Sequence, residues 1–353
     1  MASADSAQAV LPSLLHHNPV QLGVLSLAVE QSQKWLRSSC IMCKENETEV
    51  TEFRLLGFKG LNNLRFLLFF VLLLVYNVIV GGNLLIICLV STNDALKIPM
   101  FFFVKHLAIA DVLLTTCIIP LTLDIILKTE GVISVRGCMT QLSLFGIFVC
   151  VQCFIIAIMS YDRYVAISKP LQYTLIMDSK ICFHLIFWSW FLVVSLVSSE
   201  MIYGRQFPFC GQNVVDHFFC DFGPVLALQT TDTAVARLED LLISLVTIFF
   251  PFTFILGTYL YIFITVIKMS STAGKIKAFS TCSSHLVTVG IHYGTLITVY
   301  VSPTNEDSPD LNKFRSLLYI VVTPLMNPIL YSFRNHEIKL SLQKLFKGIK
   351  GTH

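Results

Sequence analysis

The sequence predicts an all-α membrane protein, a seven-transmembrane helix bundle followed by a short amphipathic cytoplasmic helix. Of its 353 residues, 55% are hydrophobic and only 13% are charged, and the mean hydropathy of +0.72 excludes a soluble enzyme of this size. Seven apolar runs are long enough to cross a bilayer as helices and too long for barrel strands. They lie at residues 64–90, 99–127, 138–167, 181–202, 241–267, 278–301 and 314–333.

The distribution of charge predicts how the bundle is oriented. Lysine and arginine concentrate in the cytoplasmic connections of membrane proteins, so the N-terminus is expected outside and the C-terminus in the cytoplasm of a plasma-membrane protein. The basic residues that flank the even-numbered connections and the tail are Lys169, Lys180, Lys268, Lys275, Lys277, Arg334, Lys339, Lys344, Lys347 and Lys350. The acidic residues of the opposite loops are Glu200, Asp216, Asp221, Asp232, Glu239, Asp240, Glu306, Asp307 and Asp310.

The N-terminal region differs from the rest. Residues 1–41 are expected to form a disordered extension, and Met42 is an alternative start. Asn46 opens an N-glycosylation sequon, which the charge argument places outside. Cys40 and Cys43 have no second pair nearby, so incidental thiols are favoured over a metal site, and no metal is predicted. The expected parts are an extracellular N-terminus at 1–63, the transmembrane domain at 64–333 and the cytoplasmic helix and tail at 334–353.

Polar residues inside the first two runs are candidates for function. Asn83 follows Gly81 and Gly82, which let a neighbouring helix approach closely. Asp111 falls near the middle of the membrane, where a carboxylate costs several kcal/mol and is functional by default. A structural hydrogen bond between Asn83 and Asp111 is the alternative, and the two roles are compatible.

The third run joins two chemically different ends. Twenty-five positions separate Cys138 from Arg163, and a helix would hold them about 38 Å apart, which is one bilayer with its head groups. The thiol is therefore expected at one face, and Asp162 with Arg163 at the other. The uncharged turns between them are where a small molecule would bind.

The connection after the fourth run, residues 201–240, is long enough to be a functional lid. It contains Cys210 and Cys220, and Cys138 lies in the same oxidising compartment at the top of the third run. A disulfide from either loop cysteine to Cys138 would pin the lid over the mouth of the bundle.

The last run contains two prolines. Pro324 and Pro328 each remove a backbone donor, so residues 323–331 are expected to be kinked or unwound, with Asn327 beside the kink and reaching toward Asp111. Beyond Arg334, apolar residues gather on one helical face and lysines on another, which is typical of a helix lying on the membrane surface. The apolar residues are Ile338, Leu342, Leu345 and Ile349.

Short motifs occur along the whole chain. They are GN at Gly82, PMFFF with LAIAD ending at Asp111, SYDRYVAIS from Ser160, KPLQY from Lys169, HFFCD from His217, KAFSTCSSHL from Lys277, HYGT from His292 and PLMNPILYSFRN from Pro324. Together they resemble the olfactory receptors, which are rhodopsin-like (class A) G-protein-coupled receptors. The resemblance covers residues 46–346 in the same order.

The resemblance implies a role for each matching position. Arg163 is expected to leave Asp162 and contact a G protein, while Tyr259 and Tyr331 hold the active state. The remaining switch residues are Tyr164, His285, Asn327 and Pro328. The other implied sets are a disulfide between Cys138 and Cys220 and a buried polar network of Asn83, Asp111, Gln152 and Asn327. The implied partners are a small neutral odorant, a heterotrimeric G protein of the stimulatory, olfactory type that raises cyclic AMP, and the lipid bilayer.

Some positions depart from the family pattern. Thr230 stands where the family usually has a third loop cysteine, so Cys210 is expected to lack its usual partner and to stay out of a second loop disulfide. Gln152 stands where the family usually has glutamate, which argues against a sodium site around Asp111.

Other classes of membrane protein fit less well. A transporter would show two related halves, and the sequence has no such internal repeat. An intramembrane protease would need a second acid beside Asp111, which the apolar runs lack, so no enzyme activity is predicted. Phe145 stands where amine receptors keep an aspartate, which argues against an amine ligand. A chemoreceptor of the same fold for a non-odorant lipid or metabolite, expressed outside the olfactory epithelium, remains the alternative.

The outer half of the bundle is the predicted ligand site. Few ionisable side chains appear in its apolar runs, and an unpaired buried charge is costly, so neutral and mostly apolar ligands are expected. Thr247 and Tyr300 are the candidate hydrogen-bond donors. No cofactor and no nucleic-acid partner are expected. The predicted ligand-binding residues are Phe145, Gly146, Val149, Cys150, Ile243, Thr247, Tyr293, Leu296, Ile297 and Tyr300.

Overall fold

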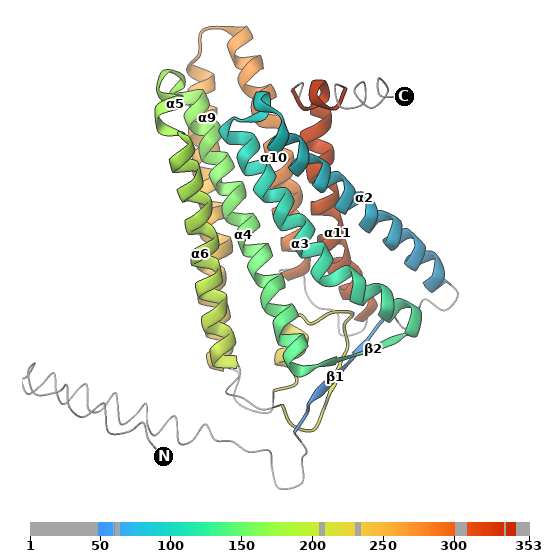
Figure 1. Ribbon diagram of the computed structural model, residues 1–353. Coiled ribbons are helices and arrows are strands. Elements are labelled where there is room, and N and C mark those ends of the chain that lie inside the picture. The colour runs from blue at the N-terminus through green and yellow to red at the C-terminus, as the bar shows by residue number, and fades with distance from the viewer. Residues whose placement is uncertain are drawn as a thin grey trace, which may run out of the picture.

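The computed structural model describes residues 49–58, 60, 64–204, 209–229, 234–300, 309–334 and 337–343. Long helices form a bundle, and short strands lie across one end (Figure 1). The long helices are α2 (Leu64–Thr92), α3 (Pro99–Lys128), α4 (Val135–Ser168), α6 (Ser179–Gly204), the continuous α8 (Ala234–Ser244), π-helical η5 (Leu245–Phe249) and α9 (Phe250–Lys268), α10 (Thr272–Tyr300) and α11 (Pro309–Arg334). Short helical segments are η3 (Asp94–Leu96), η4 (Pro170–Gln172), α5 (Tyr173–Ile176) and α7 (Phe222–Leu226).

The seven apolar runs each correspond to one long helix, which confirms the predicted bundle. Within the described ranges, six helices are long and apolar enough to cross a membrane. The remaining long helix, α10, has 29 residues and carries more serine, threonine and histidine along its length. Several helices begin before their apolar run, as α10 does at Thr272, because polar turns extend the helix beyond the hydrocarbon.

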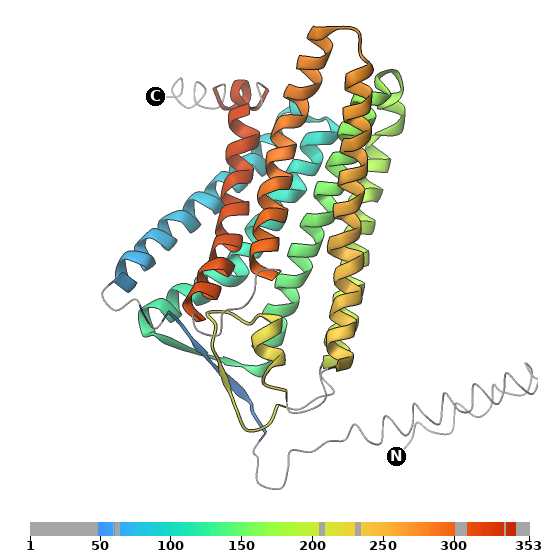
Figure 2. The same cartoon turned by 180° about the vertical axis from the view of Figure 1, so that it is seen from behind.

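Helix α4 is the centre of the bundle. Of its most apolar stretch 67% is buried inside the protein, against 22% both for α2 and for the helix made of α8, η5 and α9. Figure 1 shows α4 running between α3 and α6, and Figure 2 shows α9 and α10 on its other side, with α11 beside α2 and α3. The large exposed apolar side chains of α2, such as Phe66, Phe70 and Leu74, therefore face lipid.

Helix α11 stays helical through both internal prolines, so of the two predicted alternatives for residues 323–331, a kink or unwinding, the unwinding does not occur. Pro328 has no N–H to donate to the carbonyl of Pro324, four residues earlier. The side chain of Asn83 on α2 replaces it, because its Nδ2 donates to the Pro324 oxygen at 3.0 Å. Gly82 lets the helices approach at this point, since a Cβ there would lie 3.4 Å from Pro328.

A small sheet covers one end of the bundle. Its strands are β1 (Glu52–Leu56), β2 (Glu130–Ser134) and β3 (Val214–Val215), in the order β2-β1-β3. β1 pairs antiparallel with β2, placing Arg54 opposite Val132, and parallel with β3. Phe53 and Leu55 point inward and are fully buried. The fold is therefore mostly rather than purely helical, because strands of two to five residues are too short to show alternation in the sequence.

The two ends of the bundle are named by what they carry. The disulfide end carries the Cys138–Cys220 bond and the sheet, and the Arg163 end carries Asp162 and Arg163. Residues 337–343 are helical, and Ile338 is buried against the bundle. Asn93 after α2 donates to the Ser341 hydroxyl at 2.6 Å, which fixes this helix at the Arg163 end.

Several predictions fall outside the described residues. They concern the extension 1–41, the alternative start at Met42, the sequon at Asn46, the C-x-x-C cysteines, Thr230 and the tail beyond 343.

Candidate ligand cavity and switch

A cavity of about 670 Å³ opens in the half of the bundle near the disulfide end. Its walls come from α4, α6, α8 to α9 and α10, and residues around α7 close it toward the sheet. All ten residues predicted to contact a ligand line this cavity. Its volume is in the range of small-molecule sites.

Most of the wall is apolar, and its polar groups are few. The Thr247 hydroxyl donates to the Ile243 carbonyl at 2.8 Å and lies 3.3 Å from the Cys150 thiol, which donates to it. Thr247 is thus engaged within the protein and is a weaker donor than predicted. Tyr300 is half-exposed. Tyr293 is 5% exposed, and because its hydroxyl oxygen is shut off from the cavity, the ring is the part of this side chain that lines it.

One end of the cavity is acidic, which corrects the premise of the neutral-ligand prediction. Glu200, Asp221, Glu239 and Asp240 all line it, together with Arg237. Asp221 is 9% exposed. Burial raises the pKa of its carboxyl to about 6, the Phe222 N–H opposes this, and the nearby Asp240 charge adds to it.

Sequence reasoning missed these acids because it placed the start of the helix wall too late. The fifth apolar run begins at Leu241, but the helix begins at Ala234. Glu239 and Asp240 are therefore inside the helix that forms the wall rather than in the loop before it. Glu200 has a different explanation: it lies inside the fourth apolar run, near the end of α6, but was counted with the acids of the following loop.

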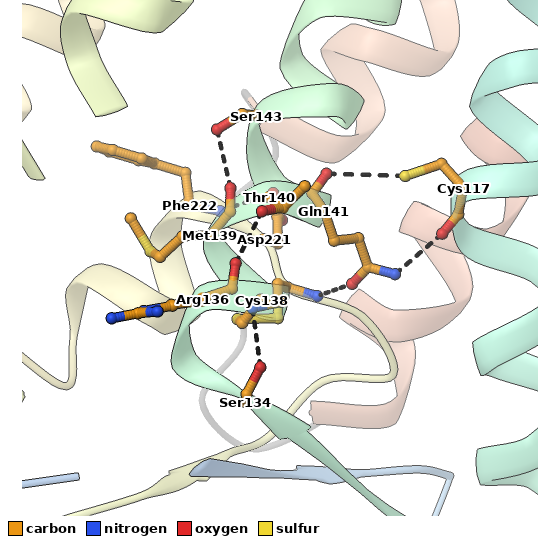
Figure 3. Close-up of a disulfide and its surroundings, with 12 residues drawn as sticks. Cys117, Ser134, Arg136, Cys138, Met139, Thr140, Gln141, Ser143, Asp221 and Phe222 are labelled. Carbon is orange, nitrogen blue, oxygen red and sulfur yellow. Dashed lines mark hydrogen bonds between the residues drawn. A yellow bond between two sulfur atoms is a disulfide. The ribbon is translucent and has the colours of Figure 1, made fainter. Parts of the chain in front are cut away.

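A disulfide joins Cys138 at the start of α4 to Cys220 in the loop, with the two α-carbons 5.5 Å apart. The side chain of Gln141 clamps the same place (Figure 3). Its Nε2 donates to the Cys117 carbonyl at 3.1 Å, and its Oε1 accepts from the Cys220 N–H at 3.0 Å. The bond and the amide together fix the loop to α4 and α3.

Cys210 is disulfide-bonded as well. The threonine at the usual partner position, Thr230, therefore does not leave Cys210 as a free thiol. It is buried, and its backbone forms an antiparallel bridge with Glu49.

A buried lysine ties three segments of the disulfide end together. Lys313 at the start of α11 is 1% exposed. Its Nζ contacts Asp216 beside β3 at 2.6 Å and donates to the Gly57 carbonyl after β1 at 3.0 Å. His217 is also buried, and burial followed by the Lys313 charge lowers its pKa to about 3, so it is neutral at physiological pH. No sequence motif predicts these contacts of Lys313, because the residues that make them are far apart in the chain.

Three of the four predicted network residues meet in the middle of the bundle. Asp111 accepts from Gln152 Nε2 at 2.9 Å and from Asn327 Nδ2 at 2.8 Å, and all three side chains are buried. Asn83 bonds to α11 instead, and within the described residues no hydrogen bond joins it to Asp111. The structure therefore gives Asn83 and Asp111 separate roles.

Of the predicted switch residues, Asn327 lies with Asp111 in the middle of the bundle, and Asp162 and Arg163 lie at the Arg163 end. The Nε of Arg163 donates to Asp162 Oδ2 at 3.1 Å, and the Tyr173 hydroxyl donates to Asp162 Oδ1 at 2.7 Å. Arg163 is therefore paired with Asp162 in this structure. Tyr164 packs edge-on against Tyr261, and Pro328 lies beside Gly82.

A second contact at this end joins α9 to α10 and α4. His285 Nε2 lies 3.1 Å from the Ile156 carbonyl, so it carries the proton and donates. Its Nδ1 then accepts from the Tyr259 hydroxyl at 2.6 Å. Tyr331 on α11 is buried, at 3% exposed.

Comparison with known proteins identifies the family. A family model described as olfactory receptor matches residues 72–348. Olfactory receptor 10A7 of Homo sapiens is 42% identical over 303 residues, which are 86% of this chain and 96% of the relative. Olfactory receptor 5G26 of Mus musculus is 42% identical over 306 residues, 87% of this chain and 96% of the relative.

The fold has a counterpart among solved structures. The crystal structure of squid rhodopsin aligns with a TM-score of 0.67 at 18% identity, covering 82% of this chain and 87% of that one. The resemblance inferred from the motifs is confirmed, and the chain is a multi-pass plasma-membrane receptor rather than an enzyme. It belongs to the olfactory receptor family.

Proposed function

We propose that this chain is an odorant receptor whose ligand occupies the 670 Å³ cavity and that signals through a stimulatory, olfactory-type G protein to raise cyclic AMP. The observation that carries the proposal is that the same two helices, α4 and α10, contribute residues both to the cavity and to the switch. Helix α4 contributes Cys150 to the cavity and Arg163 to the switch, and α10 contributes Tyr293 and His285 in the same way. A ligand that shifts α10 against α4 therefore acts on both sites.

Contacts between the two sites support this coupling. The Cys153 thiol on α4 lies 3.3 Å from His292 Nε2 on α10, just below the cavity. Further along the same helices, His285 on α10 meets the Ile156 carbonyl on α4. A change in packing at the cavity floor has a continuous buried route to the Tyr259–His285 contact.

The mostly apolar wall favours small, mostly apolar organic molecules. With few polar anchors, affinities are expected in the micromolar range, about −8 kcal/mol. The disulfide end is proposed to face outward, since disulfides persist in oxidising compartments. Lys169, Lys180 and Lys268 lie near the other end, which is proposed to face the cytoplasm.

The test fills the cavity without touching the switch. Gly146 lines the cavity, and a Cβ there meets only Val197 at 4.0 Å, so Gly146→Leu projects its side chain into the ligand space. Gly257→Leu on the exposed face of α9 is the matched control, because nothing lies within 4 Å of its Cβ. In cells screened with odorants for cyclic AMP, Gly146→Leu should raise the EC50 about tenfold or more. Equal responses of both variants at equal surface expression would exclude this cavity.

A further inference from the structure

We propose that Cys210, in the loop that closes the cavity, forms a disulfide with Cys43 of the N-terminal segment. This bond is independent of the proposed function, because it concerns how the disulfide end is held together and not what the cavity binds. It gives Cys43 a role in place of the incidental thiol that its sequence context favoured.

The other cysteines of the chain leave Cys210 few partners. The sequence has eleven cysteines, and Cys210 is disulfide-bonded. Within the described residues, Cys138 bonds to Cys220. The other six described cysteines are free thiols, namely Cys88, Cys117, Cys150, Cys153, Cys182 and Cys282. Cys40 and Cys43, outside the described residues, are what remains, and because the structure contains a single chain the partner is one of these two.

The chain that leads into β1 runs directly beside Cys210. The backbone of Cys210 forms an antiparallel bridge with Glu49, and the Val50 N–H donates to the Phe209 carbonyl at 2.9 Å. Phe209 also packs edge-on against Phe53 of β1, with the ring centroids 5.0 Å apart. The residues just after the N-terminal cysteines are therefore already fixed against the loop at Cys210.

Cys43 is better placed than Cys40 to reach this point. Cys43 precedes Glu49 by six residues, whereas Cys40 precedes it by nine. Six residues span up to about 20 Å when extended, which is enough chain to turn back and bring the two α-carbons within the roughly 7 Å that a disulfide needs. The shorter loop closes at the lower cost in entropy, which favours Cys43.

The chemistry of the bond needs only what this end of the protein already requires. The bond between Cys138 and Cys220 indicates an oxidising compartment at the disulfide end. Two thiols become one disulfide by giving up two protons and two electrons. A disulfide of a folding oxidoreductase in that compartment accepts them by thiol–disulfide exchange and becomes a dithiol.

The bond fixes the N-terminal segment to the loop that closes the cavity. The loop residues after Cys220 include Phe222 and Leu226, which line the cavity, and Phe209 forms a backbone bridge with the lining residue Gln229. A covalent link at Cys210 therefore limits how far this wall of the cavity can move away from β1.

Peptide mapping of the unreduced wild-type chain tests the bond directly. The full receptor is purified in detergent, and free thiols are alkylated in denaturant before digestion. Trypsin releases residues 38–44, which contain both N-terminal cysteines, and Asp-N cleavage before Asp216 separates Cys210 from Cys220. The partner of each loop cysteine is then identified on its own by mass spectrometry.

Cyanogen bromide distinguishes the two N-terminal cysteines, because it cleaves after Met42, between them. Cys43 is expected in the product linked to Cys210, and Cys40 in the piece that cleavage releases. An alkylated Cys210, a link from Cys210 to Cys40, or a link to a second copy of the chain overturns the proposal.

Paired variants measure what the bond holds. Cys40→Ser is the matched control, since it removes a thiol from the same segment and keeps the proposed bond. Adding Cys43→Ser should leave Cys210 fully alkylated and accelerate hydrogen exchange at the Val50 amide about tenfold or more, because the loop carbonyl that accepts from this amide is no longer tied. Equal exchange in the two proteins overturns the tie, and the mapping of the wild-type chain decides the bond even where the double variant does not fold.

Discussion

The hydrogen bond of Asn83 is set by what a neighbouring helix lacks. Asn83 donates to the Pro324 carbonyl because Pro328 has no N–H to offer it. The sequence identified Asn83 and the prolines as unusual but paired Asn83 with Asp111 instead. Residue type alone shows that a buried amide needs a partner, whereas the choice between two partners depends on how the helices approach.

Replacing Asn83 should therefore destabilise the bundle through α11. In Asn83→Ala the Pro324 oxygen is left buried without a donor, which costs about 1–3 kcal/mol. Asn77→Ala on the same helix is the matched control, because its Nδ2 bonds only to the Leu73 carbonyl at an exposed position. Thermal melting of purified receptor in detergent should show a clear drop in Tm for Asn83→Ala alone. Equal Tm values for the two variants would contradict the role given to Asn83.

The residues that line the ligand cavity were predictable where they lie on helices with a clear register. Helical spacing from the motifs placed all ten predicted residues on its wall. The acids were not predictable in this way, since hydropathy marks where the hydrocarbon ends and not where a helix ends. Glu239 and Asp240 lie in that margin, inside a helix but outside the apolar run, whereas Glu200 lies in the last turns of its run at 181–202.

At the scale of elements, the disulfide end is assembled from segments distant in the chain. The sheet brings together β1, β2 and β3, and Lys313 of α11 joins the ends of β1 and β3 through Gly57 and Asp216. Local sequence patterns cannot predict such an assembly, because each strand is too short to carry a periodic signal. The long helices, by contrast, carry their signal over many turns, and all of them were found.

The Lys313 tie should hold these elements together. Lys313→Met keeps the apolar stem but leaves the Gly57 carbonyl and Asp216 without their cation, and because Asp216 is 44% exposed the expected loss is only about 1–3 kcal/mol. Hydrogen exchange at the β1 amides should accelerate in this variant.

Lys128→Met provides the comparison for that experiment. Its ion pair with Asp124 is exposed, with side chains 67% and 45% accessible, and is worth at most about 1 kcal/mol. Unchanged exchange in β1 after loss of Lys313 would show that the sheet is held by its own hydrogen bonds and the disulfide.

Across the whole molecule, the disulfide end is tightly held while part of the cavity wall is loosely packed, as a receptor that moves on binding requires. The disulfide, the Gln141 amide and the Lys313 tie fix the loop and sheet to α3, α4 and α11. The helix of α8, η5 and α9 is a less enclosed wall of the cavity than α4, with 22% of its most apolar stretch buried against 67%. Weakly packed elements are the ones that move on binding. We therefore expect a ligand to shift α9 and α10 against the fixed α4 rather than to move α4 itself.

We expect this shift of α9 and α10 to reach the ion pair between Asp162 and Arg163. Substitutions of the two members of the pair should change cyclic AMP in opposite directions. Arg163→Ala removes the side chain that is proposed to contact the G protein and should abolish ligand-driven cyclic AMP at normal surface expression. Asp162→Asn removes the charge that holds Arg163 and should raise basal cyclic AMP, because Asp162 is fully buried and its pairing is little screened by water.

Arg54→Ala is the matched control for this pair of variants. Its ion pair with Glu130 is exposed, at 50% and 47% of the two side chains, and lies at the disulfide end, so signalling should stay at the wild-type level. A fall in basal cyclic AMP with Asp162→Asn, or retained signalling with Arg163→Ala, would mean that the pair is a static support. Opposite shifts from two neighbouring residues are what a latch requires, since a purely structural pair loses function whichever member is removed.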